Sequence, residues 1–253
     1  MWTDDQLNIR INEAVLWLRT KVAEANAKGV VVGLSGGVNS AVTAGLCVKA
    51  FPDNCILVIM PSHADPEDIE DAYWIAEGFD LRPLEVNLSN AYGQIFDQIE
   101  PGLQNERYDI IGEKASQDNL QARLRMSALN TVADAVNYLL VGVENAPRIY
   151  TGNFTKYGDN GVDLLPLSSL TKKEVQAWAR MLGFPLAIST KVSAGDQTEE
   201  AEMGVTFDQV DRFLSGEEVP SEISERIETL NCQSQHKRNL PLSLDLPVLK
   251  GLK

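Results

Sequence analysis

The sequence predicts an α/β fold with a doubly wound, mainly parallel sheet and helices on both of its faces. Short runs of apolar residues, such as 30–34 and 56–60, are typical of strands buried on both faces of a parallel sheet. Segments with helical spacing of apolar residues alternate with these runs, as in βαβ units. A glycine-rich turn, Ser35-Gly36-Gly37, joins the first run to the helix that follows it.

The N-terminal half is expected to alternate helices and strands. Apolar side chains from Leu7 to Val22 recur at helical spacing, and Lys28-Gly29 closes the helix that they predict. Asp65 is a suitable N-cap because Pro66 follows it at the first helical position. The expected elements are helix 5–27, strand 30–34, helix 41–50, strand 56–60, helix 65–78 and strand 84–88.

The C-terminal half continues this alternation and then becomes less regular. Ligands of such sheets bind at the carboxyl ends of the strands, so the turns at Ser35, Pro61 and Glu144 are expected to meet there. The tail from Asn239 has no helical period. The expected elements are helix 115–137, strand 138–143, helix 172–182, a loop-rich stretch over 185–207, and helices 205–214 and 221–230.

Composition is that of a soluble globular protein. The chain has 253 residues, which predicts one domain spanning residues 1–253. No stretch approaches the ~20 apolar residues that a membrane helix needs, and the N-terminus lacks a signal-peptide pattern, so a cytoplasmic protein without a membrane partner is expected. Three cysteines (Cys47, Cys55 and Cys232) are too few and too scattered for a disulfide framework or a zinc site.

The net charge of −14 argues against nucleic acid as a partner, because phosphates would be repelled. A nucleotide substrate must therefore find cations that are placed locally. The turn after the first strand offers part of such a site. Ser35 and Ser40 supply hydroxyls, two glycines allow close approach of an anion, and a helix N-terminus supplies free N–H groups. No lysine follows the glycines, so the turn is not a Walker A loop.

This turn resembles the pyrophosphate-binding loop SGGxDS of the ATP pyrophosphatases, with Asn39 in place of the aspartate. Further motifs, in the same order, resemble those of ammonia-dependent NAD synthetases, and the resemblance runs from the first helix to Pro241. The motifs are Asn119–Met126, Gly152–Asp159, Asp163–Leu167, Ser193-Ala194-Gly195 with Glu202-Met203-Gly204, and Gln235–Arg238.

The resemblance implies a Rossmann-like ATP pyrophosphatase domain without a glutaminase domain, acting as a homodimer. It implies that the nicotinate carboxylate of deamido-NAD attacks the α-phosphate of ATP, giving an adenylated intermediate and pyrophosphate. Ammonia, free or from another protein, then displaces AMP and leaves NAD. ATP is thus a substrate, and the resemblance implies Mg²⁺ beside it. Such chemistry needs alignment of two anionic groups and neutralisation of the leaving pyrophosphate.

The resemblance also assigns residues to roles. Taken alone, Arg123 and Arg125 would be a solvated helix face, and residues 236–238 a basic tail. With the resemblance, the expected ATP-binding residues are Ser35, Gly36, Gly37, Asn39, Ser40, Arg123, Lys172 and Ser193. The expected substrate-binding residues are Lys156, Asp159, Asp163, His236 and Lys237, and the candidate catalytic residues are Lys172, Ser193 and Arg148.

The chain departs from the family pattern where the metal ligands are expected. Asn39 and Arg148 replace the two acids, so the metal ligands are unknown. The segment from Ser193 to Glu202 is also a few residues short. On one account Arg148 supplies the lost positive charge, since a guanidinium binds phosphate oxygens bidentately. On the other, the chain is a decayed nucleotide-binding or regulatory homologue, because an incomplete lid leaves the intermediate exposed to water.

Two further activities stay open. Nicotinate mononucleotide needs the same adenylation site as deamido-NAD, so no motif separates the two acids. A thiolase acting on tRNA would share the Ser-Gly-Gly loop, but the acidic balance and the lack of a cysteine pair or a basic stripe argue against it. The sequence therefore favours amidation of deamido-NAD, with the mononucleotide as the alternative substrate.

Overall fold

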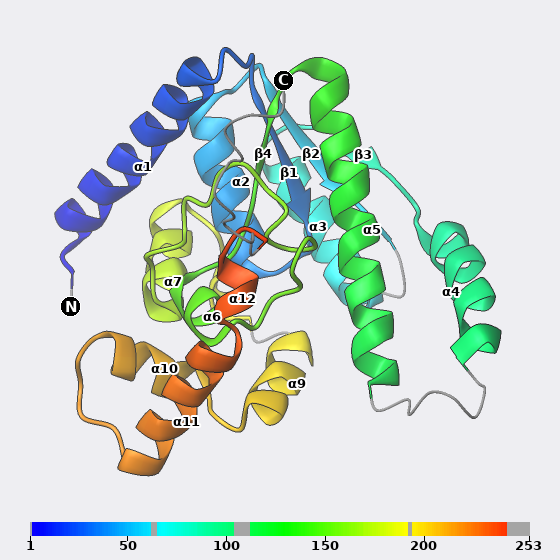
Figure 1. Cartoon of the computed structure of the whole chain (residues 1–253). Coiled ribbons are helices and arrows are strands. Elements are labelled where there is room, and N and C mark those ends of the chain that lie inside the picture. Colours follow the sequence, from blue (N-terminus) through cyan, green and yellow to red (C-terminus); the bar gives the residue numbers. More distant parts are fainter. Residues whose placement is uncertain (1, 62–64, 104–111, 192–193, 242–253) are drawn as a thin grey trace, which may run out of the picture.

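The computed structural model describes residues 2–61, 65–103, 112–191 and 194–241. Its centre is a parallel sheet with the strand order β3-β2-β1-β4 (Figure 1). Each neighbouring pair of strands runs in the same direction, with Val30 opposite Cys55 and Leu139. The strands are β1 (Val30–Leu34), β2 (Cys55–Ile59), β3 (Leu84–Glu85) and β4 (Leu139–Val141).

Helices precede, connect and follow the strands, and several begin at side-chain caps. Thr3 caps α1, Asp65 caps α3 as the sequence predicts, and Thr171 caps α7. The helices are α1 (Asp4–Glu24), α2 (Val38–Ala50), α3 (Pro66–Gly78), α4 (Ser89–Leu103), α5 (Glu113–Val136), α6 (Ala146–Thr151), α7 (Lys172–Met181), α8 (Leu186–Ser189), α9 (Ala194–Met203), α10 (Phe207–Leu214), α11 (Ser221–Gln233) and α12 (Gln235–Arg238).

The two faces of the sheet are covered differently. Side chains alternate along a strand, so Val30 and Val32 face one core while Val31 faces the other. The first core is formed with α1, α2, α3 and α7, and the second with α5, through Met126 and Leu129. The doubly wound α/β fold with helices on both faces is therefore confirmed.

A third, smaller core holds the C-terminal helices beside α6 (Figure 1). Its buried residues are Met203 from α9, Val205 from the turn after α9, Phe207 and Val210 from α10, and Ile227 from α11. Since α10 and α11 both contact α6, this core fixes the end of α9 and the start of α10 next to the carboxyl end of β4. The structure thereby places Phe207 where it can reach the site described below.

Several sequence expectations need correction. The stretch 185–207 was expected to be loop-rich, but it contains α8 and α9. Helix α9 escapes an apolar-period search because Met203 is the buried residue among its described side chains. Helices α4 and α6 were not expected either, and β3 is shorter than the run 84–88. Within the described ranges, no helix combines the length and the apolar character that crossing a membrane requires.

Candidate active site

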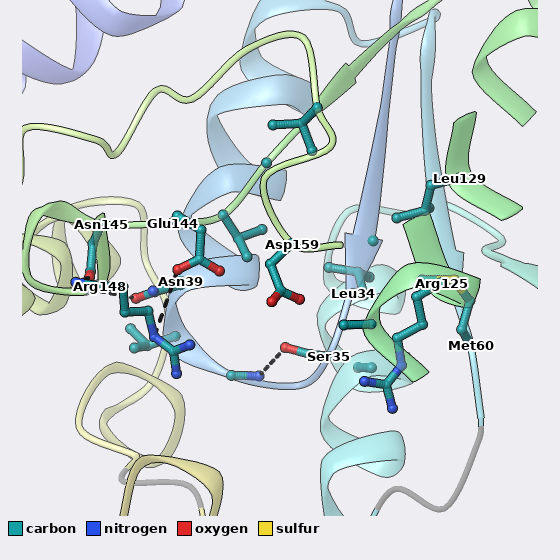
Figure 2. A pocket seen from close by; sticks show the side chains of 18 of the residues that line it. Leu34, Ser35, Asn39, Met60, Arg125, Leu129, Glu144, Asn145, Arg148 and Asp159 are labelled. Carbon is teal, nitrogen blue, oxygen red and sulfur yellow. Dashed lines mark hydrogen bonds and ion pairs between the residues drawn. The ribbon is translucent and has the colours of Figure 1, made fainter. Parts of the chain in front are cut away.

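A cavity of about 430 Å³ opens at the carboxyl ends of β1, β2 and β4 (Figure 2). This is the edge where the sequence places the functional turns, and a volume of this size suits a small-molecule ligand. Apolar side chains from strands and α5 form one part of the wall. The polar and charged residues that line it are Ser35, Asn39, Asp68, Arg125, Glu144, Asn145, Arg148, Asp159, Lys172 and Glu199.

The floor of the cavity is the turn from Ser35 to Ser40. Gly36 has φ +78°, and a Cβ there would lie 2.0 Å from the backbone oxygen of Asp68. Only glycine fits this conformation and this close approach. Ser40 Oγ donates to the Gly37 carbonyl at 2.9 Å. Ser35 Oγ accepts from Gly37 N at 3.4 Å (Figure 2). These bonds shape the backbone at the N-terminus of α2, an end that attracts anions.

Helix α6 brings Arg148 to the same floor. Asn145 caps this helix, accepting a hydrogen bond from the Arg148 N–H at 3.3 Å. The Asn145 side-chain amide also donates to Asn39 Oδ1 at 3.5 Å, so the start of α6 is joined to the first turn of α2. The Arg148 side chain then points into the cavity below Glu144 (Figure 2).

Arg148 is held by carboxylates and by an aromatic ring. One guanidinium nitrogen lies 2.6 Å from a Glu199 carboxylate oxygen, and Nε lies 3.9 Å from Glu144. The guanidinium carbon lies 5.7 Å from the centre of the Phe207 ring, and Lys172 Nζ lies 4.5 Å from that centre. Phe207 therefore contacts two cations at once without neutralising either of them.

Lys172 is oriented by the cap of its own helix. Thr171 and Glu174 form a capping box at the start of α7. The carboxylate of Asp211 accepts hydrogen bonds from the backbone N–H groups of Lys172 at 2.9 Å and Lys173 at 3.0 Å. Burial raises the pKa of Asp211, although these two hydrogen bonds oppose the shift. The first turn of α7 is fixed, and the Lys172 side chain extends from it along the cavity wall.

A third cation, Arg125, lies across the cavity from Arg148 (Figure 2). Burial lowers the pKa of Arg125, while the charges of Asp159 and Asp118 oppose that shift. An arginine keeps its proton under such conditions, so Arg125 adds positive charge to the cavity. The Asp159 carboxylate points into the space between the two guanidinium groups (Figure 2). One of its oxygens also accepts from the Thr155 N–H at 2.8 Å.

The structure separates the sequence-predicted residues into two sets. Ser35, Gly37, Asn39, Asp159, Arg148 and Lys172 line the cavity, and Gly36 and Ser40 belong to its floor. Five others are not among the lining residues and contact the protein's own backbone. Three of them donate to backbone carbonyls: Arg123 to that of Lys156, Lys156 to that of His236, and Lys237 to those of Gly152 and Phe154. Asp163 accepts from the Leu140 N–H, and His236 Nδ1 contacts the Gln233 carbonyl. Ser193 lies outside the described residues.

Several cavity residues have no role that the sequence predicts. Arg125 was quoted within a motif but given no role, although its spacing from Ala122 and Met126 places it on the cavity-facing side of α5. Glu144 stands in a turn that the sequence places at this edge of the sheet, four residues before Arg148, but the sequence gives it no role. Glu199 and Phe207 give no local signal. They meet Arg148 only through the packing of the α9–α10 region beside α6, which the sequence pattern does not reveal.

A glycine turn at the carboxyl end of a parallel strand, facing a cavity lined by two arginines and a lysine, is typical of α/β proteins that bind nucleotide phosphates. Comparison with known proteins gives the family. The sequence profile of the NAD synthase family matches residues 10–241. The chain belongs to the NAD synthase family.

Curated relatives and solved structures agree with this assignment. The NH(3)-dependent NAD(+) synthetase of Alkaliphilus oremlandii is 44% identical over 238 residues, which cover 92% of this chain and 95% of the relative. The NH(3)-dependent NAD(+) synthetase of Carboxydothermus hydrogenoformans is 42% identical, and the alignment covers 95% of this chain and 97% of the relative. The structure of NMN synthetase from Francisella tularensis superposes with a TM-score of 0.87 at 32% identity, covering 97% of this chain and 100% of that one. The structure of NAD+ synthetase from Burkholderia pseudomallei superposes with a TM-score of 0.76 at 27% identity, covering 93% of this chain and 91% of that one.

Proposed function

We propose that this protein is a C–N ligase that amidates deamido-NAD to NAD with ammonia, using ATP. The observation that carries the proposal is the Ser35–Ser40 floor, which faces a cavity lined by Arg148, Lys172 and Arg125. A carboxylate oxygen of the nicotinate attacks the α-phosphorus, and the bond from that phosphorus to the pyrophosphate oxygen breaks. Ammonia then attacks the acyl carbon, AMP leaves with the bonding electrons, and the nitrogen loses a proton.

The residues of the cavity suit the first step. Backbone N–H groups of the first turn of α2 would bind the phosphates, together with the Ser35 and Ser40 hydroxyls, which would exchange their contacts within the turn for the ligand. Lys172 and Arg148 would neutralise the charge that gathers on the leaving pyrophosphate. Asn39 would add an amide at the start of α2. Ser193 and Arg123 stay proposed ATP ligands on the resemblance alone.

Magnesium held by protein side chains does not fit the residues present. Among the residues described, no three His, Cys, Asp or Glu side chains are grouped so that they could hold a metal ion. The two positions where the resemblance places metal-binding acids hold the guanidinium of Arg148 and the neutral amide of Asn39. Both changes disfavour a hard cation, which prefers charged oxygen ligands. No step of the mechanism above is therefore assigned to a protein-bound metal.

Ammonia is proposed to come from solution or from another protein. Glutamine hydrolysis would need a reactive thiol, and the cavity lining contains none among the described residues. Burial raises the pKa of Cys55 to about 12, and burial together with the charge of Cys55 raises that of Cys47 well above its ordinary value. A thiol with such a pKa is a poor nucleophile at neutral pH. We propose that residues 1–253 form a single domain that uses ammonia directly and is located in the cytoplasm.

A homodimer is the proposed assembly. Helix α4 has no buried residue, yet Ile95, Ile99 and Leu103 give it an apolar stripe that is exposed in this chain. The helix packs beside α5, which alone among the described helices builds the second core of the sheet. A second copy placed on α4 and α5 would bury this stripe. Light scattering that gives the mass of one chain at assay concentrations would contradict this assembly.

Nicotinate mononucleotide is the second candidate substrate. The observation that favours it is the likeness to NMN synthetase from Francisella tularensis, at a TM-score of 0.87 against 0.76 for the Burkholderia pseudomallei NAD+ synthetase. Both acids present the same nicotinate carboxylate for adenylation. They differ in the second nucleotide, so a comparison of the two substrates at equal concentration decides between them.

The test is product formation by the purified protein. The protein receives ATP, magnesium, ammonium and either deamido-NAD or nicotinate mononucleotide, and AMP, NAD and NMN are quantified. NAD with an equal amount of AMP supports the proposal, and NMN formed from the mononucleotide alone reassigns the substrate. No AMP with either acid, from protein that still binds ATP, would show a decayed or regulatory homologue.

A matched pair of variants ties the activity to the cavity. Lys172→Met removes a cation from the cavity wall and should lower turnover by about ten- to a thousandfold. Lys173→Met removes the neighbouring charge, which is exposed and pairs with Asp208 at 2.6 Å outside the cavity. Turnover should stay near that of the unmodified protein in this control. Equal turnover in the two variants would contradict the role given to Lys172.

A further inference from the structure

Arg148 is a cavity cation that already has a strong anionic partner on a different helix. Its guanidinium lies 2.6 Å from a carboxylate oxygen of Glu199, and the two side chains are 20% and 23% exposed. Glu199 belongs to α9, whereas Arg148 belongs to α6. Glu144 lies farther from the guanidinium, at 3.9 Å, and its side chain is 4% exposed. The short contact thus joins the cavity floor to a helix whose sole buried described side chain is Met203.

The surroundings of this pair are built for an anion. The start of α6 is joined to the first turn of α2 by the Asn145–Asn39 contact of 3.5 Å, so Arg148 stands beside the glycine turn. On its other side the ring of Phe207 contacts the guanidinium, and this ring is held in the third core, where Phe207 is buried. A guanidinium held in this way presents a planar set of donors that matches phosphate oxygens.

We propose that Arg148 binds the phosphate chain of the nucleotide directly, and that Glu199 is its resident counter-ion, which the phosphate displaces. The positive charge at this end of the cavity then comes from the protein itself rather than from a divalent cation on protein carboxylates. The inference rests on the proposed function in one respect, namely that the ligand is a nucleoside triphosphate.

The sign of the effect of Glu199 follows from electrostatics. A carboxylate and a phosphate that bind the same guanidinium repel each other, so Glu199 must move away when the phosphate binds Arg148. The free energy of breaking the Arg148–Glu199 pair is then subtracted from the free energy of ATP binding. Removing the charge of Glu199 should therefore strengthen ATP binding, which is the reverse of what loss of an ordinary ligand does.

The first experiment measures ATP binding by calorimetry in the presence of EDTA, so that it needs neither turnover nor metal. Arg148→Met should weaken binding by about ten- to a hundredfold. Glu199→Gln should tighten it by about three- to tenfold, since a partly exposed pair is of modest strength. Glu202→Gln makes the same change of charge on an exposed residue of the same helix and should leave the affinity nearly unchanged.

The double variant shows whether Glu199 acts through Arg148. If it does, Glu199→Gln should have little effect on ATP affinity once Arg148→Met is present. Arg148→Lys keeps the charge without the planar donors, and it should bind ATP with intermediate affinity; this keeps the test valid if Arg148→Met folds poorly. The proposal is overturned if Glu199→Gln weakens binding, if it behaves like Glu202→Gln, or if Arg148→Met and Arg148→Lys both bind like the unmodified protein.

Magnesium provides the second experiment. ATP binding by the unmodified protein should be nearly the same in EDTA and in magnesium. The double variant Asn39→Asp with Arg148→Glu recreates two acids at the floor and should bind ATP tightly only with magnesium. An affinity of this variant that is equal under both conditions would count against the proposal. Amidation without any effect of Arg148 on ATP binding overturns this inference alone, whereas ATP binding that responds as described, without amidation, overturns only the proposed function.

Discussion

Two groups of basic side chains in the C-terminal half of the chain have different surroundings. In the cavity group, Arg148 contacts the Glu199 carboxylate of another helix, and both Arg148 and Lys172 contact the Phe207 ring. In the second group, Lys237 donates to the Gly152 and Phe154 carbonyls, and Arg238 donates to the Ile149 and Tyr150 carbonyls. The first set of contacts can be exchanged for a ligand, and the second holds the chain together.

The difference shows why a charge in a motif does not define a ligand contact. A backbone carbonyl that loses its donor stays buried without a partner, so its contact with a lysine or an arginine is costly to break. A carboxylate on a surface helix can turn to water instead. We therefore expect substitutions in the second group to change stability, and substitutions in the cavity group to change nucleotide binding.

The largest effect is expected at Gly36, where the cavity depends on backbone shape. Gly36→Ala should lower the free energy of unfolding by about 3–5 kcal/mol and abolish ATP binding, because the residue has φ +78° and the new Cβ would overlap the Asp68 carbonyl at 2.0 Å. Gly216→Ala is the matched control, since Gly216 has φ +73° with nothing within 4 Å. It should cost about 1–2 kcal/mol through strain alone and leave ATP binding intact. Chemical denaturation and calorimetry measure both quantities, and equal losses of stability at the two glycines would contradict the overlap.

The next largest effect is expected for substitution of Arg238, which tests the difference between the two groups of basic side chains. One of its terminal nitrogens lies 3.2 Å from the Ile149 carbonyl, 3.1 Å from that of Tyr150 and 2.8 Å from Ser234 Oγ. Arg238→Met should lower the free energy of unfolding by about 2–4 kcal/mol, because the two carbonyls of α6 and the Ser234 hydroxyl after α11 lose a charged donor.

ATP affinity at a temperature where the variant is folded is the readout that separates the two groups. Arg238→Met should bind ATP like the unmodified protein, whereas Lys172→Met should bind it more weakly with little change in unfolding. An Arg238→Met protein of normal stability with impaired ATP binding would place Arg238 in the cavity group and overturn the comparison.

The parts of this site that the sequence predicts are local, and the parts that it misses are assembled by packing. The Ser35–Ser40 turn follows from adjacent residues, and the parallel sheet follows from short apolar runs, so both could be predicted. The pairing of Arg148 with Glu199 joins residues 51 positions apart. It depends on α9, whose sequence favours a helix but carries little apolar pattern that would predict its position.

The smallest predicted effect concerns Glu174, which pairs with Arg10 of α1 and also closes the capping box at the start of α7, beside Lys172. Burial raises the pKa of Glu174, but hydrogen bonds from Arg10 at 2.6 Å, from the Thr171 backbone and from Trp2 at 2.8 Å outweigh it, so that the pKa is lowered overall. A carboxylate whose folded pKa lies below its unfolded pKa stabilises the protein above the unfolded value and loses that contribution as the pH falls through the folded value.

Glu174→Gln should therefore cost about 1 kcal/mol at neutral pH and less in acid, because its hydrogen-bond partners are only partly buried. Denaturation at neutral pH and at a pH below the ordinary pKa of glutamate measures the free energy of unfolding of Glu174→Gln and of the unmodified protein. The difference between the two should become smaller in acid. Glu13→Gln, on the exposed surface of α1, should leave a curve parallel to that of the unmodified protein. ATP affinity should be unchanged in both variants, because glutamine can keep the contact with the Thr171 backbone N–H that closes the capping box beside Lys172. A constant difference in the free energy of unfolding between Glu174→Gln and the unmodified protein across this range would show that the titration of Glu174 makes no contribution to acid stability.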